Sequence, residues 1–333
     1  MRVVLEPGGP RFDPGPPERP PGEHAVRVRI ELAGVCRSDL KEVAGSRYGV
    51  SQFGHELVGV VEESTLPGLP PGQRVTLDPN VAIERSTGFA TTMWAAGPAD
   101  RLGAALPAVQ RHIPARTLVF TEPLACARHC LARAARHLDR DLAGVRLGVL
   151  GAGAAGVLIA ALARTMGLDV VLTNRTPDRR AFLRERGIVD VPIVPTASVP
   201  AGALDVAVLA TSFIHPDVLR EALRMTTRGG LLLLYGGTAP GDSLPGLDCD
   251  LDTVRRREGI VTTRWQGREV RIAGTYGTLP ADFEAALGDL AGPAIAPHRI
   301  ERMIARQVGL VELPGLLREQ TTGRHLGKTL VVP

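Results

Sequence analysis

Cysteine is scarce in this chain of 333 residues. The four cysteines stand at positions 36, 126, 130 and 249. They are too few and too scattered for a disulfide framework, a pattern typical of a reducing compartment. No Cys-x-x-Cys pair occurs, so the sequence does not encode a zinc finger.

The sequence also lacks features typical of secretion, nucleic-acid binding and membrane association. The first residues, Met1 to Pro7, predict a short strand and lack the apolar core of a signal peptide, so we expect a cytoplasmic protein. The net charge of +4 is spread along the chain without a basic tract, which argues against nucleic-acid binding. The uncharged stretch from Leu147 to Ala163 is short for a membrane span, so we expect no membrane association.

Chain length and residue pattern predict two domains, because 333 residues are many for one core. The first part of the chain is rich in proline and β-branched residues and predicts a β-rich domain. Its expected strands are 24–33, 56–63 and 74–77. From about Pro123, strands alternate with helices, as in a parallel sheet. The strands expected there are 169–173, 203–210, 230–235 and 270–274.

A glycine motif follows an apolar strand at the start of this second part. Gly151, Gly153 and Gly156 form G-x-G-x-x-G between that strand and a helix of Ala, Leu and Ile. Gly151 permits a tight turn, Gly153 lets a pyrophosphate approach the backbone, and Gly156 lets helix and strand pack closely. The helix N-terminus favours phosphate charge. The motif therefore predicts a dinucleotide site.

A second group of residues predicts a metal site. Cys36 lies in Cys-Arg-Ser-Asp, and His55 follows in Phe-Gly-His-Glu. Zinc prefers sulfur and nitrogen ligands, and a catalytic zinc needs only three protein ligands. Two candidates for the third ligand, Glu122 and Cys126, lie in one short segment, and the residues alone leave both open.

The order and spacing of these motifs resemble the zinc-dependent medium-chain dehydrogenase/reductase family, in its alcohol and polyol dehydrogenase branch. The resemblance covers nearly the whole chain. It implies an α/β plus β fold, in which a Rossmann doubly wound parallel sheet is inserted into a GroES-like β-rich catalytic domain. We expect the catalytic domain at 1–125 and 276–333 and the dinucleotide-binding domain at 126–275. A homodimer or homotetramer is also expected.

The resemblance assigns roles to the residues around the metal motif. Cys36 and His55 match zinc ligands, and Glu56 matches a carboxylate that ligates the metal in some members. Ser38 matches the hydroxyl that bridges the substrate oxygen to a proton relay. Asp39 matches the carboxylate that orients the ligand histidine. The position after Cys36, Arg37, matches a contact to the cofactor pyrophosphate.

The chain departs from the family pattern at several points. Residues 78–114 contain no cysteine, so the lobe that binds a structural zinc is missing, and we expect one catalytic zinc alone. Lys41 stands where a relay histidine is often found. Glu122 matches the polyol-dehydrogenase carboxylate, which we favour slightly, and Cys126 matches the alcohol-dehydrogenase thiolate.

The end of the second strand of the dinucleotide motif bears on cofactor choice. Asn174 occupies the place where an acidic residue would bind the ribose of NAD and repel the phosphate of NADP. Arg175, Thr176 and Arg179 follow and offer donors to a phosphate. We therefore expect a preference for NADP, with NAD as the alternative.

Together these features predict an NAD(P)-dependent alcohol or polyol dehydrogenase acting on a small secondary alcohol of polyol, sugar or cyclitol type. Tyr48, Asn80 and Trp94 are candidate pocket residues, although ordinary packing would also account for each of them. The competing hypotheses are a zinc-free quinone or enoyl reductase and a non-catalytic NADP-binding sensor.

Overall fold

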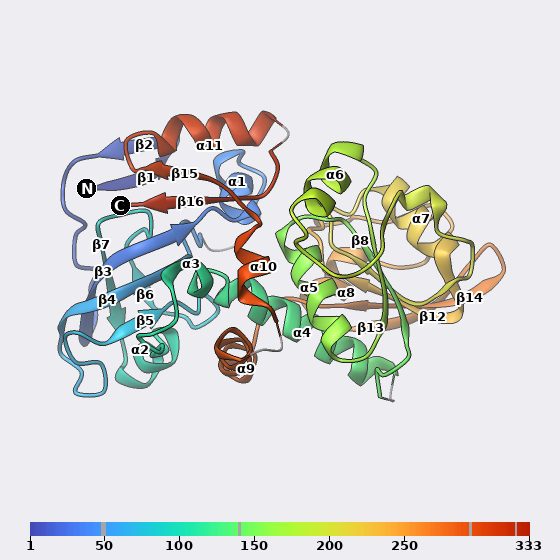
Figure 1. The fold of residues 1–333 in the computed structure, drawn as a ribbon, viewed down its shortest axis with the longest axis horizontal. Coiled ribbons are helices and arrows are strands. Elements are labelled where there is room, and N and C mark those ends of the chain that lie inside the picture. Colours follow the sequence, from blue (N-terminus) through green and yellow to red (C-terminus); the bar gives the residue numbers. More distant parts are fainter. Residues whose placement is uncertain (48–50, 139–140, 293–294, 324) are drawn as a thin grey trace. The chain divides into compact units, whose positions relative to one another are not determined.

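The protein folds into two compact units, as a computed structural model describes for residues 1–47, 51–138, 141–292, 295–323 and 325–333 (Figure 1). The first unit comprises Met1–Glu122, Leu279–Pro293 and Ile304–Pro333. The second comprises Pro123–Thr278 and Ala294–Met303. The C-terminal part of the chain therefore contributes to both units.

The first unit is built on a mainly antiparallel sheet with the strand order β15-β16-β3-β4-β5. Strand β7 pairs with the first part of β3, on the same edge that β16 pairs with further along, and β6 pairs with β7, while β1 and β2 form a separate hairpin. The strands of this unit are β1 (Arg2–Glu6), β2 (Gly9–Asp13), β3 (His24–Gly34), β4 (Glu56–Ser64), β5 (Arg74–Thr76), β6 (Glu84–Arg85), β7 (Thr92–Gly97), β15 (Ile304–Gly309) and β16 (Lys328–Val332). Its helices are α1 (Arg37–Val43), α2 (Ala99–Ala105), α3 (Ala115–Leu118), α9 (Pro280–Ala291) and α11 (Leu313–Thr322).

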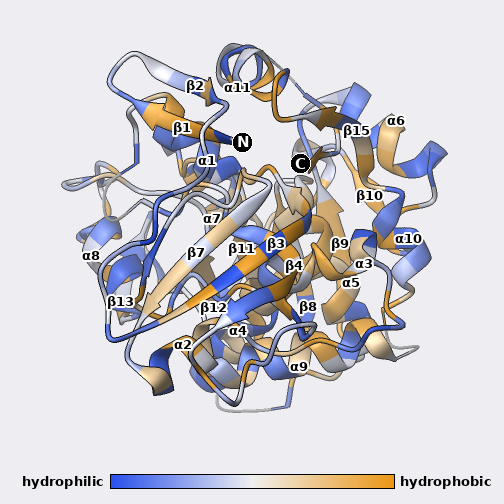
Figure 2. Cartoon of the chain, turned by 90° about the vertical axis from the view of Figure 1, so that its left-hand side faces the viewer, coloured by the Kyte–Doolittle hydropathy of each residue, from blue (hydrophilic) through white to orange (hydrophobic). Residues whose placement is uncertain are grey.

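Strand β3 organises the core of this unit. Val26, Val28 and Ile30 alternate with more polar residues, which Figure 2 shows as bands of the two colours along the strand. These three side chains are buried in one cluster with residues of β4 and β5. Period-two alternation therefore predicted the strand.

The second unit contains a seven-stranded sheet with the order β10-β9-β8-β11-β12-β14-β13. Its strands are β8 (Arg146–Leu150), β9 (Asp169–Thr173), β10 (Ile193–Val194), β11 (Leu204–Leu209), β12 (Thr226–Leu234), β13 (Ile260–Trp265) and β14 (Arg268–Gly274). Its helices are α4 (Thr121–Leu138, which begins in the first unit), α5 (Ala154–Thr165), α6 (Pro177–Glu185), α7 (Pro216–Met225), α8 (Leu251–Arg256), α10 (Pro297–Glu301) and the short 3-10 helix η1 (Thr196–Ser198).

All neighbours in this sheet are parallel except β13, which is antiparallel to β14. The chain order runs outward from β8 through β9 to β10, and then outward from β11 through β12 to β14. This reversal beside β8 is the switch point at which doubly wound sheets bind ligands. The predicted doubly wound parallel sheet is confirmed. Within the described residues, no helix combines the length and apolar character that crossing a bilayer requires.

Candidate active site and cofactor cradle

The register of β3 against β4 brings the two predicted metal-binding segments together. Gly34, at the end of β3, pairs with Glu56, the first residue of β4. Cys36 follows β3 by two residues, and His55 directly precedes β4. Because the strands are antiparallel, the end of one lies beside the start of the other. Residues separated in the sequence thus meet where β3 ends and β4 begins.

Cys36, His55 and Glu56 form a three-ligand group. Their possible ligand atoms, one sulfur, one nitrogen and one oxygen, all lie within 4.8 Å of one another. Cys36 is half-buried, while His55 and Glu56 are 2% and 1% exposed. A thiolate, an imidazole and a carboxylate are zinc ligands, so this donor set fits that ion.

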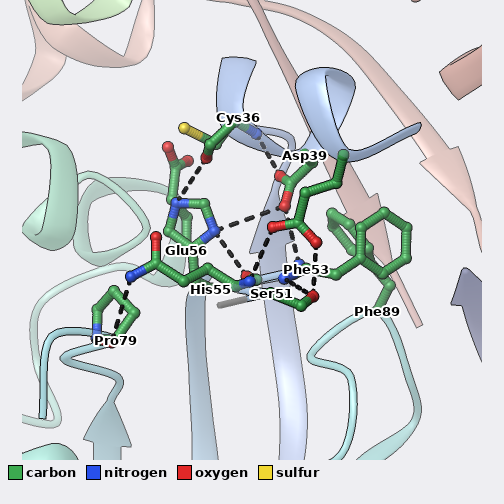
Figure 3. Close-up of polar contacts among 12 residues, drawn as sticks. Cys36, Asp39, Ser51, Phe53, His55, Glu56, Pro79 and Phe89 are labelled. Carbon is green, nitrogen blue, oxygen red and sulfur yellow. Dashed lines mark hydrogen bonds and ion pairs between the residues drawn. The ribbon is translucent and has the colours of Figure 1, made fainter. Parts of the chain in front are cut away.

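The hydrogen bonds of His55 determine which nitrogen can bind a metal (Figure 3). Nδ1 lies 2.8 Å from the carbonyl oxygen of Gln52. A carbonyl can only accept, so Nδ1 carries a proton, and Nε2 is the nitrogen available to a metal. Nε2 lies 3.4 Å from the Ser38 hydroxyl, on the side of the ring away from Gln52. The imidazole is therefore prepared to ligate through Nε2.

Asp39 joins the two ligand segments. It is fully buried, and its Oδ2 accepts from the Cys36 amide at 2.7 Å. Its Oδ1 accepts from the Gly54 amide at 3.0 Å and lies 3.5 Å from His55 Nδ1. Gly54 has φ of +67°, and a side chain there would come within 2.7 Å of the Phe89 amide nitrogen. The turn before His55 thus requires glycine.

Glu56 is also bound to Lys328, the first residue of β16. The two side chains form a buried ion pair with 1% and 4% exposure. Burial lowers the pKa of Lys328 to about 8, although the charges of Cys36 and Asp39 act to raise it. The sequence motifs did not predict this contact. A lysine opening an otherwise apolar strand was the available signal.

Cys36 and His55 each favour the charged form of the other. Burial would raise the pKa of the Cys36 thiol, but His55 and Lys328 lower it. Burial would likewise lower the pKa of His55, but Cys36 and Asp39 raise it well above its usual value. A lowered thiol pKa favours the thiolate, which is the metal-binding form.

The thiols should therefore differ in reactivity in the metal-free protein. Burial raises the pKa of Cys249 to about 11, and it raises the pKa of Cys130 further. Because alkylation requires thiolate, iodoacetamide should label Cys36 first, and its labelling should persist to lower pH than that of Cys249. Site-resolved mass spectrometry over a pH series measures this order. Equal rates for Cys36 and Cys249 at neutral pH would contradict it, and bound zinc should protect Cys36.

The other predicted residues near the metal group are distributed as follows. Arg37 and Lys41 lie in α1, and burial lowers the pKa of Arg37. Glu122 is 9% exposed, and its charge acts to raise the pKa of Cys36. Cys126 lies one turn further along α4, in the second unit.

Two of the three candidate pocket residues contact a neighbouring side chain. The Asn80 amide donates to Asp78 at 3.2 Å. The Trp94 ring lies 5.7 Å from the Arg27 guanidinium, within cation–π range. Tyr48 lies outside the described residues.

The glycine motif forms a cradle between β8 and α5. Gly151 has φ of +117° and lies close to the carbonyl of Ala210. A side chain on Gly156 would come within 1.8 Å of the Gly151 oxygen. Gly153 is the N-cap of α5, and nothing lies within 4 Å of the position its Cβ would take. The cradle is thus tight where helix and strand meet and open where a phosphate would approach.

The residues after β9 form an ordered turn. Asn174 Oδ1 accepts from the Thr176 amide at 2.9 Å, and Thr176 is the N-cap of α6. Arg180 donates to the Asn174 carbonyl at 2.6 Å, so it braces the turn. Arg175 forms an exposed ion pair with Asp217 of α7. Arg179 lies in the first turn of α6.

Comparisons with known proteins agree with this arrangement. Residues 22–113 match the alcohol dehydrogenase GroES-like domain. The chain is 28% identical to a sorbitol dehydrogenase of Halalkalibacterium halodurans over 81% of its own length and 82% of that protein. It is 26% identical to an uncharacterized zinc-type alcohol dehydrogenase-like protein of Haemophilus influenzae, over 89% and 88% of the two chains.

Solved structures share the fold. A protein from Sinorhizobium meliloti whose structure contains NADP matches with a TM-score of 0.77 and 23% identity, covering 100% of this chain and 98% of that one. Galactitol-1-phosphate dehydrogenase of Escherichia coli matches with a TM-score of 0.74 and 18% identity, covering 100% and 99%.

Proposed function

We propose that this chain, which is similar to zinc-dependent medium-chain dehydrogenases/reductases, oxidises a secondary alcohol reversibly with a nicotinamide cofactor. The observation that carries this proposal is the buried Cys36, His55 and Glu56 group, whose donor atoms lie within 4.8 Å of one another. The glycine cradle of the second unit supplies the other half of the chemistry, a dinucleotide site.

The residues of this chain have separate tasks in the proposed reaction. Cys36 and His55 would hold zinc together with a carboxylate or a further thiolate, and the ion would supply Lewis acidity toward an alcohol oxygen. Ser38, whose hydroxyl lies 3.4 Å from His55 Nε2, would accept the hydroxyl proton while hydride leaves the carbon for the nicotinamide. Lys41 lies three residues further along α1, on the same helix face, and would receive the proton next.

The third protein ligand is proposed to be Glu122, with Glu56 nearby. Support comes from the influence of Glu122 on the pKa of Cys36. We expect Glu122→Gln to weaken zinc binding about 10- to 100-fold, because a neutral amide is a poorer zinc ligand than a carboxylate. Cys126→Ser should leave zinc binding near wild type. Chelator competition measures both, and the opposite order would assign the thiolate of Cys126 instead.

We propose NADP as the preferred cofactor, with one catalytic zinc and no structural zinc. Asn174 brings no negative charge to the 2′-position of the ribose, and Arg175, Thr176 and Arg179 offer donors to a phosphate there. Asn174→Asp should lower kcat/KM for NADP about tenfold or more, because the new carboxylate repels the phosphate, and should leave kcat/KM for NAD unchanged or higher. A wild type that prefers NAD, and keeps that preference in Arg175→Ala, would contradict the assignment.

The substrate is proposed to be a polyol, sugar or cyclitol. Relatives named as sorbitol, mannitol and erythritol/L-threitol dehydrogenases support this class. The edge strand β13 ends the sheet of the second unit and supports a homodimer or homotetramer. We place the enzyme in the cytoplasm, in keeping with its free cysteines. We also propose that the catalytic domain comprises 1–125 and 276–333, with the cofactor domain at 126–275.

A substrate panel tests the function directly. Polyols, cyclitols and simple secondary alcohols are offered with each cofactor, and formation of reduced nicotinamide is followed by absorbance. We expect turnover on at least one polyol-type alcohol that stops when zinc is chelated. Turnover without metal would indicate the quinone or enoyl reductase alternative. Tight cofactor binding without turnover on any compound would indicate a sensor.

A further inference from the structure

The segment before His55 determines how its ring is oriented. The carbonyl of Gln52 accepts from Nδ1 at 2.8 Å, whereas the nearest oxygen of Asp39 is 3.5 Å away. The position of this carbonyl therefore sets the direction in which Nε2 points. A peptide carbonyl can serve this purpose only if its backbone is itself held in place.

Glu42 of α1 holds that backbone. One of its carboxylate oxygens accepts from the Gln52 amide at 2.8 Å, and the other accepts from the Ser51 hydroxyl at 2.5 Å. The Glu42 side chain is only 6% exposed. Because α1 begins directly after Cys36, these bonds tie the His55 segment to the helix that carries the other ligand.

Two arginines, Arg47 and Arg85, offset the negative charge of the buried Glu42 carboxylate. Arg47 Nε lies 3.4 Å from Glu42 Oε1, and Arg47 also donates to the Gln52 side chain at 2.6 Å. Arg85 donates to the Phe53 carbonyl at 3.2 Å. Burial lowers the pKa of Arg85 to about 10, against the pull of Asp39 and Glu42. The segment 51–55 is thus bound by Glu42 and Arg47 and also by Arg85.

Asp39 and Glu42 bind different parts of the two ligand segments. Asp39 bonds to the amides of Cys36 and Gly54 and so fixes the separation of the two ligand segments. Glu42 accepts from the backbone N–H of Gln52, the residue whose carbonyl orients the ring. Sequence reasoning identified Asp39 but attached no role to Glu42, because its contacts lie nine and ten residues away across a turn.

We propose that Glu42 is a positioning residue for the metal ligand His55, acting through the backbone of Gln52. This inference rests on the proposed zinc site. Glu42 acts because its side chain is long enough to accept the hydrogen bond from the Gln52 amide. The negative charge of Glu42 serves only to balance the neighbouring arginines.

Two substitutions of Glu42 separate the effect of side-chain length from the effect of negative charge. Glu42→Asp keeps the charge but shortens the side chain by one methylene, so it loses the Gln52 amide. Glu42→Gln keeps the reach and an acceptor oxygen, and its amide nitrogen can donate to the Ser51 hydroxyl. The matched controls are Glu63→Asp and Glu63→Gln on β4, where Glu63 forms an exposed ion pair with Arg27.

Zinc affinity, measured by chelator competition, and the visible absorption spectrum of the cobalt-substituted protein are the readouts. We expect Glu42→Asp to weaken zinc binding about tenfold and to alter the cobalt spectrum. Glu42→Gln should remain close to wild type in both, as should the Glu63 controls. These readouts report ligand geometry and do not depend on turnover.

The outcomes are distinct. If Glu42→Gln is impaired and Glu42→Asp is not, or if both match wild type, Glu42 does not position His55. A wild-type protein that binds no zinc would overturn the proposed function and this inference with it. A wild type that binds zinc, beside unaffected Glu42 variants, would overturn this inference alone.

Discussion

Replacing Cys36 with alanine should remove zinc and nearly all dehydrogenase activity. The sulfur is one of three possible donors held within 4.8 Å of one another, and without it the proposed zinc site keeps only two of its three protein ligands. A Lewis acid contributes several kcal/mol of transition-state stabilisation. Since each 1.36 kcal/mol is a tenfold change in rate, we expect kcat/KM to fall about a thousandfold.

The matched control for this experiment is Cys249→Ala. Cys249 is also half-buried, but it lies in the second unit, away from the ligand group in the sequence, and burial raises its pKa. It should keep zinc and activity. Elemental analysis and steady-state kinetics measure both variants. A Cys36→Ala protein that retains zinc and turns over at the wild-type rate would exclude Cys36 as a ligand.

Adding a methyl group to the glycine cradle should lower stability at Gly156 and cofactor affinity at Gly153. In Gly156→Ala, the new Cβ would lie 1.8 Å from the Gly151 oxygen, so helix α5 must move away from β8. Overpacking of this kind costs about 3 kcal/mol. For a unit of this size, that lowers the melting temperature by about 10 °C.

Gly153→Ala should fold like wild type and bind cofactor poorly. Its φ is −79°, which alanine adopts without strain, and no atom lies within 4 Å of the new Cβ. The methyl group would occupy the space into which a pyrophosphate approaches, so KM for the cofactor should rise about tenfold or more. Thermal melting and cofactor titration separate the two variants. Unchanged cofactor affinity in Gly153→Ala would place the pyrophosphate elsewhere.

Local patterns were sufficient to predict much of the fold. The strand expected at 169–173 is β9, and the glycine motif lies between β8 and α5 as its spacing required. Strand β13 (Ile260–Trp265) was missed, because it is an edge strand in which half-buried and exposed positions alternate. Without a continuous apolar run, nothing marked it as part of a mainly parallel sheet.

The candidate site was predictable only where its residues lie in short motifs. Cys36 and His55 were found from their neighbours in the sequence, and the pairing of β3 with β4 accounts for their meeting. The partner of Glu56 was not found, because Lys328 is 272 residues away. The carbonyl that orients His55 was also missed, since every residue has one and only the fold selects which carbonyl is used.

The central claim, that zinc held at Cys36 and His55 enables alcohol oxidation by this chain, is tested most directly by zinc titration of the metal-stripped protein. The initial rate of nicotinamide reduction is measured with an active alcohol from the panel as zinc is added. We predict negligible activity without metal and a linear rise that levels off at about one zinc per chain. Full activity in the stripped protein, or a plateau reached only near two zinc ions per chain, would contradict this account.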